Sequence, residues 1–322
     1  MRWSGLCAED KVVIPALNEE SSIGIGVRYL FEHGLRGDQL MIVDSGCTDR
    51  TVAVVLETAN AFPKGSGVQI VRVADVLGSY RHSRAGGCGI ARCVGELPCT
   101  GKGAAMYAAI RRLTEKDHPP QSRIFFLDGD IRNPEEVDPI GHLLKAWEKN
   151  PRARVAKLAA EDRQSQGLMG FANTLPSPYR LISHVAWPLC GQQSLFLADL
   201  QRMPMPTGYS VEVAMMAAIA EQYGEGCFTQ QAIPAPLLEE KHPDDLQRSV
   251  RMMSAICHFL LRMTEYGPVH TMSHRDICRW NNGSRAVENV GIPSMNGEPC
   301  VREVITIEAL LPPVVSRTTV SI

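Results

Sequence analysis

Short apolar runs rich in β-forming residues alternate with amphipathic helical patterns through the first 160 residues of the chain. This alternation is the signature of βαβ units, which place their strands in a mainly parallel sheet. At 322 residues and 44% hydrophobic content, the chain can bury a substantial core. The sequence therefore predicts an α/β fold with a mainly parallel sheet flanked by helices.

The expected strands are residues 11–16, 39–44, 68–73, 123–128 and 154–159. The expected helices lie near 19–33, 48–61, 102–116 and 135–149, and two later helical patterns lie near 210–223 and 246–265. Residues 74–101 interrupt the alternation with a Gly-rich, Arg-bearing segment. We expect a long loop there, and loops of that length are usually functional lids or disordered.

Three segments should meet at one edge of the sheet, because ligands of open α/β sheets bind beyond the carboxyl ends of the strands. They are residues 15–19, 44–48 and 128–133, and all three are polar, small or acidic. These segments are expected to form the floor of a crevice.

A buried strand ends on two carboxylates, Asp128 and Asp130, separated by Gly129. Alternate residues of an extended strand face the same side, so the carboxylates converge if the backbone keeps that relation through the turn. A hard divalent cation such as magnesium or manganese relieves their repulsion, takes oxygen ligands and usually shares them with phosphates. The alternative is that Asp130 and Asn133 cap the following helix.

Gly101 and Gly103 flank Lys102 at the start of an amphipathic helix. Backbone N–H groups, the positive end of a helix dipole and an ammonium together suit a phosphate. The segment is not a Walker A loop, because Gly95 lies six residues before Gly101 and Gly103 stands where that loop has Ser or Thr. An ordinary glycine-rich helix start remains the alternative.

Further polar residues have both structural and functional interpretations. Asp44 and Ser45 end the second expected strand, and Gly46 allows a sharp turn towards the next helix. Glu212 and His242 stand in mostly apolar or loop settings, where a lone Glu or His is more often structural than catalytic.

Charge and cysteine patterns exclude several classes of protein. The net charge is −2 with acids and bases dispersed, so neither nucleic-acid binding nor membrane-surface binding is indicated. No apolar run is long enough to span a bilayer and the N-terminus lacks a signal-peptide pattern, so we expect no membrane insertion and a cytoplasmic protein. The ten cysteines include no Cys-x-x-Cys pair, and the group Cys88, Cys93 and Cys99 does not match common zinc spacings.

Four segments in this order resemble the nucleotide-diphospho-sugar glycosyltransferases of the GT-A fold: VVIPALNEE, IVDSGCTDRT, GKGAAM and FLDGDIRNP. Two later segments, PTGYSVEVAMM and EEKHPDDL, are most similar to those of the retaining glucosyl- and mannosyl-3-phosphoglycerate synthases. The resemblance covers about residues 11–265. It implies a metal-dependent transfer of a hexose from a UDP- or GDP-sugar to a small anionic acceptor such as 3-phosphoglycerate or glycerate.

The resemblance also implies roles for individual residues. Asp130 and His242 would hold Mg²⁺ or Mn²⁺, and Glu212, Asp130 and Lys102 would be catalytic. Asp128 would contact the ribose or the metal shell. The residues that would bind the nucleotide sugar are Pro15, Ala16, Leu17, Glu19, Asp44, Ser45, Gly101, Lys102, Asp128 and Gly129.

Two departures from the family concern the acceptor and the sugar. The family has Gly-Arg-Val-Thr where this chain has residues 170–174, and these lack the arginine. The family also has Pro-Leu-Gly-Gly-Glu where residues 188–192 of this chain have Gln192 at the last position. The expected acceptor residues are Thr174, Gly191 and Gln192. The residues that could supply the missing cation are Arg81, Arg84, Arg92, Arg163 and Arg180.

The resemblance suggests three parts: a nucleotide-sugar half at 1–160, an acceptor half of the same domain at 161–267, and an extension at 268–322. The extension packs either on the body or on a second subunit, so a homodimer is one of the alternatives. Other readings are a transferase with a polyprenyl-phosphate, lipid or other carrier acceptor, and a degenerate scaffold that binds a sugar nucleotide without catalysis. Nucleotidyl transfer is disfavoured because no Gly-rich, Arg-containing loop follows the first strand.

Overall fold

The computed structural model of the chain describes most of residues 3–266 and a few short segments beyond them. The described residues are 3–82, 101–160, 166–177, 179–240, 245–266, 272, 276, 279–280, 287–291, 302–305 and 310–314.

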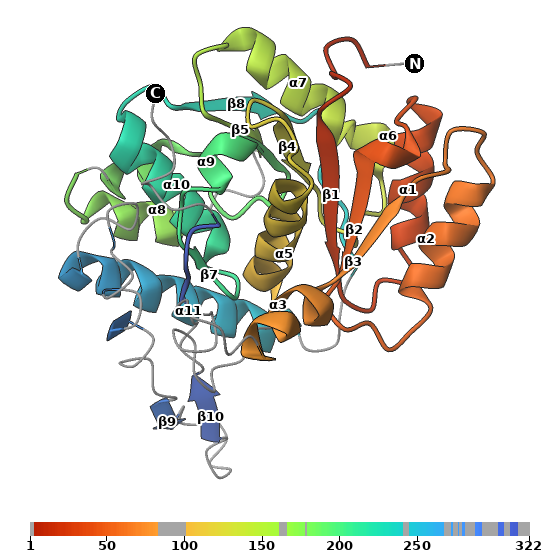
Figure 1. Cartoon of the computed structure of the whole chain (residues 1–322). Coiled ribbons are helices and arrows are strands. Elements are labelled where there is room, and N and C mark those ends of the chain that lie inside the picture. The colour runs from red at the N-terminus through yellow and green to blue at the C-terminus, as the bar shows by residue number, and fades with distance from the viewer. Residues whose placement is uncertain are drawn as a thin grey trace.

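A seven-stranded sheet in the order β3-β2-β1-β4-β6-β5-β8 forms the centre of the fold (Figure 1). Its strands are β1 (Lys11–Ala16), β2 (Leu40–Asp44), β3 (Gln69–Arg72), β4 (Arg123–Phe126), β5 (Val155–Ala159), β6 (Gln193–Phe196) and β8 (Phe228–Ala232). The pairs β3–β2, β2–β1, β1–β4 and β5–β8 are parallel, whereas β6 runs antiparallel to both of its neighbours. The expected α/β fold with a mainly parallel sheet is confirmed.

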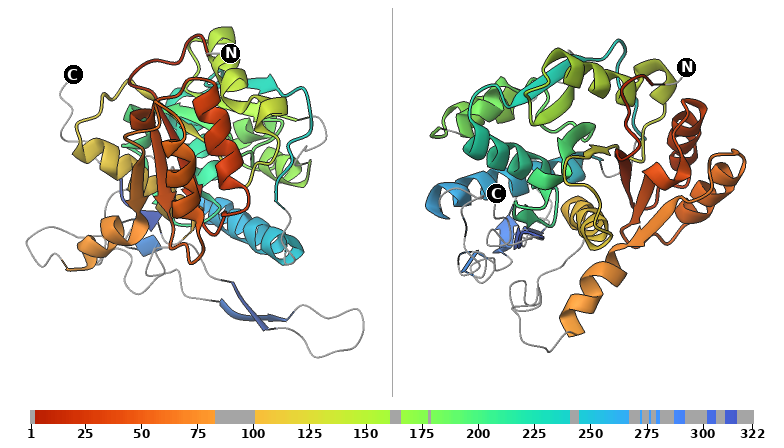
Figure 2. Two further views of the ribbon diagram at one scale, coloured as in Figure 1. Left: turned by 90° about the vertical axis from the view of Figure 1, so that its right-hand side faces the viewer. Right: turned by 45° about the horizontal axis from the view of Figure 1, so that its top comes forward.

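Helices cover both faces of this sheet (Figure 2). They are α1 (Ile23–Glu32), α2 (Thr51–Asn60), α3 (Val73–His82), α5 (Lys102–Glu115), α6 (Pro134–Val137), α7 (Pro139–Lys149), α8 (Gln166–Asn173), α9 (Leu197–Leu200), α10 (Val211–Tyr223) and α11 (Asp245–Tyr266). The right-hand view of Figure 2 shows α1 and α2 on one side of the strands, with α5 and α10 on the other.

The helices differ from the sequence prediction at two places. The helix expected near 135–149 is divided at Asp138, which has a positive φ of 43° and accepts a hydrogen bond from the Gly141 N–H at 3.1 Å. Residues 73–82, mostly expected to be loop, form α3, because Val73, Val76 and Leu77 have helical spacing and are buried. The remainder of the expected loop up to residue 100 lies outside the described residues.

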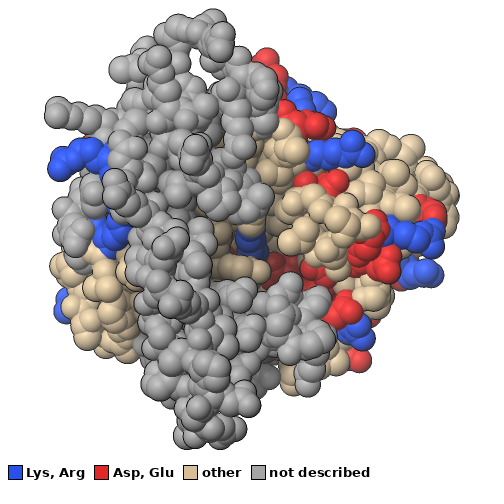
Figure 3. All heavy atoms as spheres, turned by 90° about the horizontal axis from the view of Figure 1, so that it is seen from below, with Lys and Arg blue, Asp and Glu red and all other residues tan. Residues whose placement is uncertain are grey.

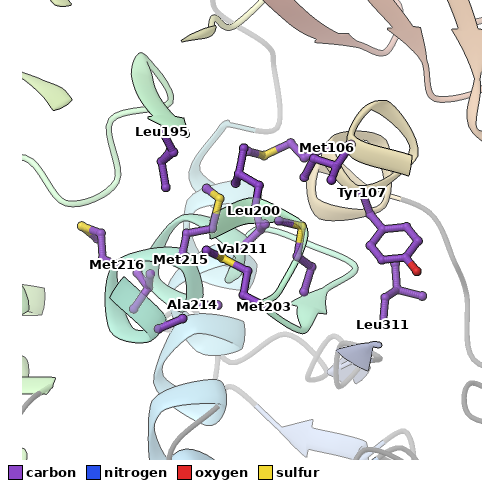
Figure 4. Packing of buried hydrophobic residues seen from close by; sticks show 14 of the residues in the cluster. Met106, Tyr107, Leu195, Leu200, Met203, Val211, Ala214, Met215, Met216 and Leu311 are labelled. Atoms are coloured by element: carbon purple, nitrogen blue, oxygen red, sulfur yellow. The ribbon is translucent and has the colours of Figure 1, made fainter. Parts of the chain in front are cut away.

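Two apolar cores lie on opposite faces of the sheet, as the alternation along β4 illustrates. Ile124 and Phe126 belong to one core, and Phe125 belongs to the other. Figure 4 shows the first core, where Met106 from α5 lies near the residues of α10. This packing fixes the N-terminal ends of α5 and α10 relative to the end of β4.

A short strand near the C-terminus, β11 (Leu310–Leu311), pairs antiparallel with β7 (Met205–Pro206). Both leucines are buried, and Leu311 lies beside Tyr107 of α5 in Figure 4. Strands β9 (Val287–Gly291) and β10 (Arg302–Ile305) form a separate antiparallel pair. Among the residues described, no helix is both long and apolar enough to cross a membrane.

Candidate active site

The three segments expected to form a crevice floor follow the carboxyl ends of β1, β2 and β4. Because α3 directly follows β3 and lies at the lower end of the sheet in Figure 1, the view from below in Figure 3 faces these strand ends. In that view a basic side chain lies in a recess near the middle of the face, with acidic side chains beside it.

The segments after β1 and β2 are joined by hydrogen bonds of both backbone and side-chain atoms. The Ser45 N–H donates to the Ala16 carbonyl at 3.0 Å, and the Glu19 N–H donates to Oγ1 of Thr51 at 2.7 Å. Asn18, which has a positive φ of 59°, accepts the Thr48 N–H through Oδ1 at 2.8 Å. The segments expected to contact the nucleotide therefore form one rigid pair of turns.

The carboxylate of Asp44 accepts hydrogen bonds within the turn after β2. Its Oδ1 accepts the N–H groups of Gly46 at 2.9 Å and Cys47 at 2.7 Å. Burial favours the neutral carboxyl, but these N–H groups outweigh burial and lower the pKa of Asp44 below its usual value. Its other oxygen lies 3.7 Å from Nε of Arg72, so a bound base would meet an already oriented carboxylate.

Asp130 has a buried oxygen, Oδ1, with no hydrogen-bond partner in the described part of the chain. Burial, followed by the charges of Asp128 and Glu239, raises its pKa from 3.8 to about 7. Asn133 begins α6 without a side-chain capping hydrogen bond, and its side chain instead binds Glu136, Pro236 and Leu238. The alternative in which Asp130 and Asn133 cap the helix is therefore not supported by their contacts.

Residues 236–240 are held against residues 130–133 along their backbones. The Glu240 N–H donates to the Asp130 carbonyl at 3.0 Å, and the Arg132 N–H donates to the Leu238 carbonyl at 2.8 Å. His242, the expected second metal ligand, lies outside the described residues. In the chain it follows two residues after Glu240, which lies beside Asp130.

Lys102 binds two carboxylates from distant parts of the sequence. Its Nζ lies 2.6 Å from Oδ1 of Asp128 and 2.6 Å from Oε1 of Glu212. Burial alone would lower the pKa of Lys102, but the two carboxylates outweigh burial and hold the pKa well above its usual value. The structure thus brings together three of the expected site residues in a buried ion cluster.

The N–H groups at the start of α5 are already used. Those of Gly103 and Ala104 donate to the carbonyls of Gly208 at 3.1 Å and Thr207 at 2.8 Å. A Cβ on Gly103 would lie 1.9 Å from the Pro206 carbonyl oxygen, so this glycine permits close approach of two backbones. These two N–H groups are therefore not available to a phosphate in this structure, because they bind the turn before α10.

Gly191 and Gln192 pack directly against Asp128. A Cβ on Gly191 would lie 2.0 Å from Oδ2 of Asp128, and Nε2 of Gln192 donates to that oxygen at 3.0 Å. Gln192 is completely buried. These two residues, expected to bind the acceptor, therefore hold the site carboxylate in this structure.

The remaining acceptor residues are not joined to this cluster by the contacts found. Thr174 is exposed and donates its hydroxyl hydrogen bond to the Phe171 carbonyl at 2.7 Å. Of the five candidate arginines, Arg180 is the one whose side chain the structure describes, and that side chain is exposed. Lys157 and Cys190 are also buried beside the cluster, and neither was expected there from the sequence, although a lysine within the apolar run RVAKLAA was a usable signal.

No protein-family model matches the chain. A curated relative, glucosyl-3-phosphoglycerate synthase of Petrotoga mobilis, is 24% identical over 273 residues, which cover 80% of this chain and 74% of the relative. Crystal structures of glucosyl-3-phosphoglycerate synthase from Mycobacterium tuberculosis are similar in fold. The complex with Mg²⁺ and UDP has a TM-score of 0.65 at 18% identity, covering 94% of this chain and 89% of the other.

A second structure of the mycobacterial enzyme, with Mn²⁺, UDP-glucose and glycerol 3-phosphate, has a TM-score of 0.62 at 17% identity, covering 95% of this chain and 90% of that one. The seven-stranded sheet and its helices therefore have the fold of the GT-A glycosyltransferases. Within that class, this chain resembles the glucosyl-3-phosphoglycerate synthases in both sequence and fold.

Proposed function

We propose that this chain transfers a hexose from a UDP- or GDP-sugar to a small anionic acceptor such as 3-phosphoglycerate or glycerate, with metal dependence and retention of configuration. The observation that carries the proposal is the unpartnered buried oxygen of Asp130, which lies at the end of β4 near the Lys102 cluster. A buried carboxylate oxygen without a donor is costly, so it indicates a missing ligand.

The residues at this edge fit a divalent cation. Asp130 supplies an oxygen ligand, and His242 would supply an imidazole nitrogen, a donor set that suits Mn²⁺ as well as Mg²⁺. In the described part of the chain, no group of three or more His, Cys, Asp and Glu side chains forms a metal cage. Phosphate oxygens of the donor would therefore complete the coordination. When bound, the ion would stabilise negative charge on the departing nucleoside diphosphate.

Lys102, Asp128 and Glu212 would position the reacting groups. The ammonium of Lys102 is shared by two carboxylates, so it can orient both of them before substrate arrives. Glu212, at the start of α10 and 4% exposed, would lie beside the sugar and the acceptor. The departing phosphate can accept the acceptor proton, so the site needs no strong enzymic base.

The donor part of the proposal can be tested by calorimetry. We expect UDP and UDP-glucose, or their GDP counterparts, to bind at least about tenfold more tightly with Mn²⁺ present, because Asp130 would hold the ion and the ion would offset the charge of the diphosphate. The Asp130→Ala variant should lose this enhancement. Transfer activity that survives this substitution would show that the metal site is assigned wrongly.

The acceptor part requires a grid of donors and acceptors with both metals, with the product anomer determined by NMR. We expect activity with 3-phosphoglycerate or glycerate and an α-linked product from an α-linked donor. A β-linked product would contradict retention, and activity that needs a lipid would favour a carrier acceptor. Failure of every nucleotide to bind with metal would favour the scaffold reading.

A further inference from the structure

Lys157 carries a buried amino group next to the site, and the proposed function does not use it. It lies on β5, is 1% exposed, and its Nζ donates to the Cys190 carbonyl at 2.7 Å and to Oε1 of Gln193 at 2.9 Å. In the described ranges no carboxylate lies within 4.0 Å of Nζ. Burial lowers the pKa of Lys157, and a lysine in such a setting is costly compared with an apolar side chain.

The strand register explains how Lys157 reaches Cys190. Lys157 lies opposite Gln193 in the β5–β6 pair, and its long side chain extends past that residue to the turn before β6. Three residues form this turn, Cys190, Gly191 and Gln192, and we name it the 190–192 turn. The lysine thus binds the first residue of the turn and the first residue of the strand that follows it.

A chain of contacts leads from this turn to the reacting end of the site. The Cys190 thiol lies 3.2 Å from Oε1 of Gln192, and Nε2 of Gln192 lies 3.0 Å from Oδ2 of Asp128. The other oxygen of Asp128 binds Lys102. Both ends of the Gln192 amide are therefore engaged, so the amide can transmit the position of the turn to the Asp128 carboxylate.

The close packing of Gly191 makes this transmission stiff. Gly191 packs so closely on Oδ2 of Asp128 that even a Cβ would not fit between them. A shift of the 190–192 turn must therefore move Asp128 or open a gap beside it. Asp128 in turn holds Lys102 against Glu212.

We propose that Lys157 is a positioning residue which, through the 190–192 turn and Gln192, sets the orientation of Asp128 for glycosyl transfer. The two hydrogen bonds donated by its Nζ hold the Cys190 carbonyl and the Gln193 side chain in place. Lys157 itself touches neither donor nor acceptor. The catalytic part of this inference rests on the proposed function, whereas the effect on the turn does not.

The position of the turn can be tested without activity, by alkylating thiols in the Lys157→Met variant and following each cysteine by peptide mass spectrometry. Cys190 is fully buried in the turn, and Cys227 is 3% exposed just before β8. We expect alkylation of Cys190 to accelerate at least about tenfold while that of Cys227 changes less than about twofold, because the opening is local. Unchanged labelling of Cys190, or an equal rise at both cysteines, would overturn the proposal.

A double-mutant cycle tests whether Lys157 acts through Gln192. We expect Lys157→Met and Gln192→Leu each to lower kcat about tenfold with donor KM changed less than about threefold, and the double variant to match the worse single variant. Independent, multiplied effects would show that Lys157 is merely structural. Lys145→Met, at an exposed position of α7, is the matched control and should keep wild-type kcat. If the wild-type protein transfers no sugar, the proposed function fails, and the labelling still decides the position of the turn.

Discussion

The ammonium of Lys102 lies 2.6 Å from Oδ1 of Asp128, although the two residues belong to a helix start and a strand end 26 positions apart. The same ammonium lies 2.6 Å from Glu212, which is 110 positions away. One cation therefore joins α5, the end of β4 and the start of α10. Its partners are two carboxylates that would otherwise repel each other in a largely buried setting.

Lys102→Met should destabilise the fold, because it leaves the buried carboxylate of Glu212 and the half-buried one of Asp128 without their cation. We expect a loss of about 3 kcal/mol in the free energy of unfolding, measured in urea at pH 8. Lys116→Met, at the exposed residue after the same helix, should change stability by less than about 0.5 kcal/mol. Adding Glu212→Gln to Lys102→Met should recover part of the loss, and a further loss would contradict the uncompensated-charge explanation.

Asp130 should make stability depend on pH in the absence of metal. Its folded-state pKa of about 7 lies above the ordinary 3.8, so the folded state binds the proton more tightly than the unfolded state. The resulting penalty grows as pH rises from about 4 to 7 and is complete above 7. With EDTA present, Asp130→Asn should therefore stabilise the protein more at pH 8 than at pH 5, by about 3 kcal/mol.

Two controls accompany this measurement of unfolding free energy at the two pH values. Asp117→Asn removes an exposed carboxylate at a positive φ that Asn tolerates, and should show no such pH dependence. Mn²⁺ should stabilise the wild-type protein at pH 8 and leave Asp130→Asn unchanged. An Asp130→Asn effect that is equal at both pH values would exclude the burial of this charge as its cause.

Gly191→Ala should disturb the site by steric contact, because the new Cβ would lie 2.0 Å from Oδ2 of Asp128. We expect a loss of about 2 kcal/mol in stability and weaker binding of UDP with Mn²⁺, measured by urea unfolding and calorimetry. The matched control is Gly170→Ala on α8, where a Cβ meets nothing within 4 Å and helix propensity improves. Equal behaviour of the two variants would contradict the close packing.

Asn18 should prove important for its backbone conformation as well as its side chain. Asn18→Gly removes the hydrogen bond to the Thr48 N–H but tolerates the positive φ of 59°, whereas Asn18→Ala loses both. The alanine variant should therefore be less stable than the glycine variant by about 1 kcal/mol. Asn18→Asp keeps the acceptor oxygen and should stay near the wild-type midpoint in urea. A glycine variant less stable than the alanine variant would refute this.

Local patterns were sufficient to predict most of the sheet. The expected strand at 11–16 matches β1, and the one at 154–159 begins one residue before β5. Both could be predicted because an apolar run between turn residues is visible within a few residues of sequence. Strand β6 was missed because its sequence, QSLF, is short and half polar. It is stabilised by pairing with β4 and β5, which no local pattern records.

The candidate site was predicted residue by residue, but its contacts were not. The paired carboxylates and Lys102 stand out in sequence, whereas their ion cluster depends on partners up to 110 positions apart. The N–H groups of Gly103 and Ala104 looked free because the competing carbonyls of Thr207 and Gly208 lie far along the chain. The roles of all these residues in binding and catalysis, and those of Thr174 and His242, remain predictions.

The antiparallel placement of β6 between β4 and β5 has a consequence for synthesis on the ribosome. A nascent chain that has released residues 1–160 already contains β1 to β4, yet the strand that separates β4 from β5 has not been made. Asp128 then lacks Gln192 and Glu212, so the acidic edge matures last. Ribosome-bound fragments of that length would therefore have an incomplete sheet and an incomplete candidate site until the whole domain has emerged.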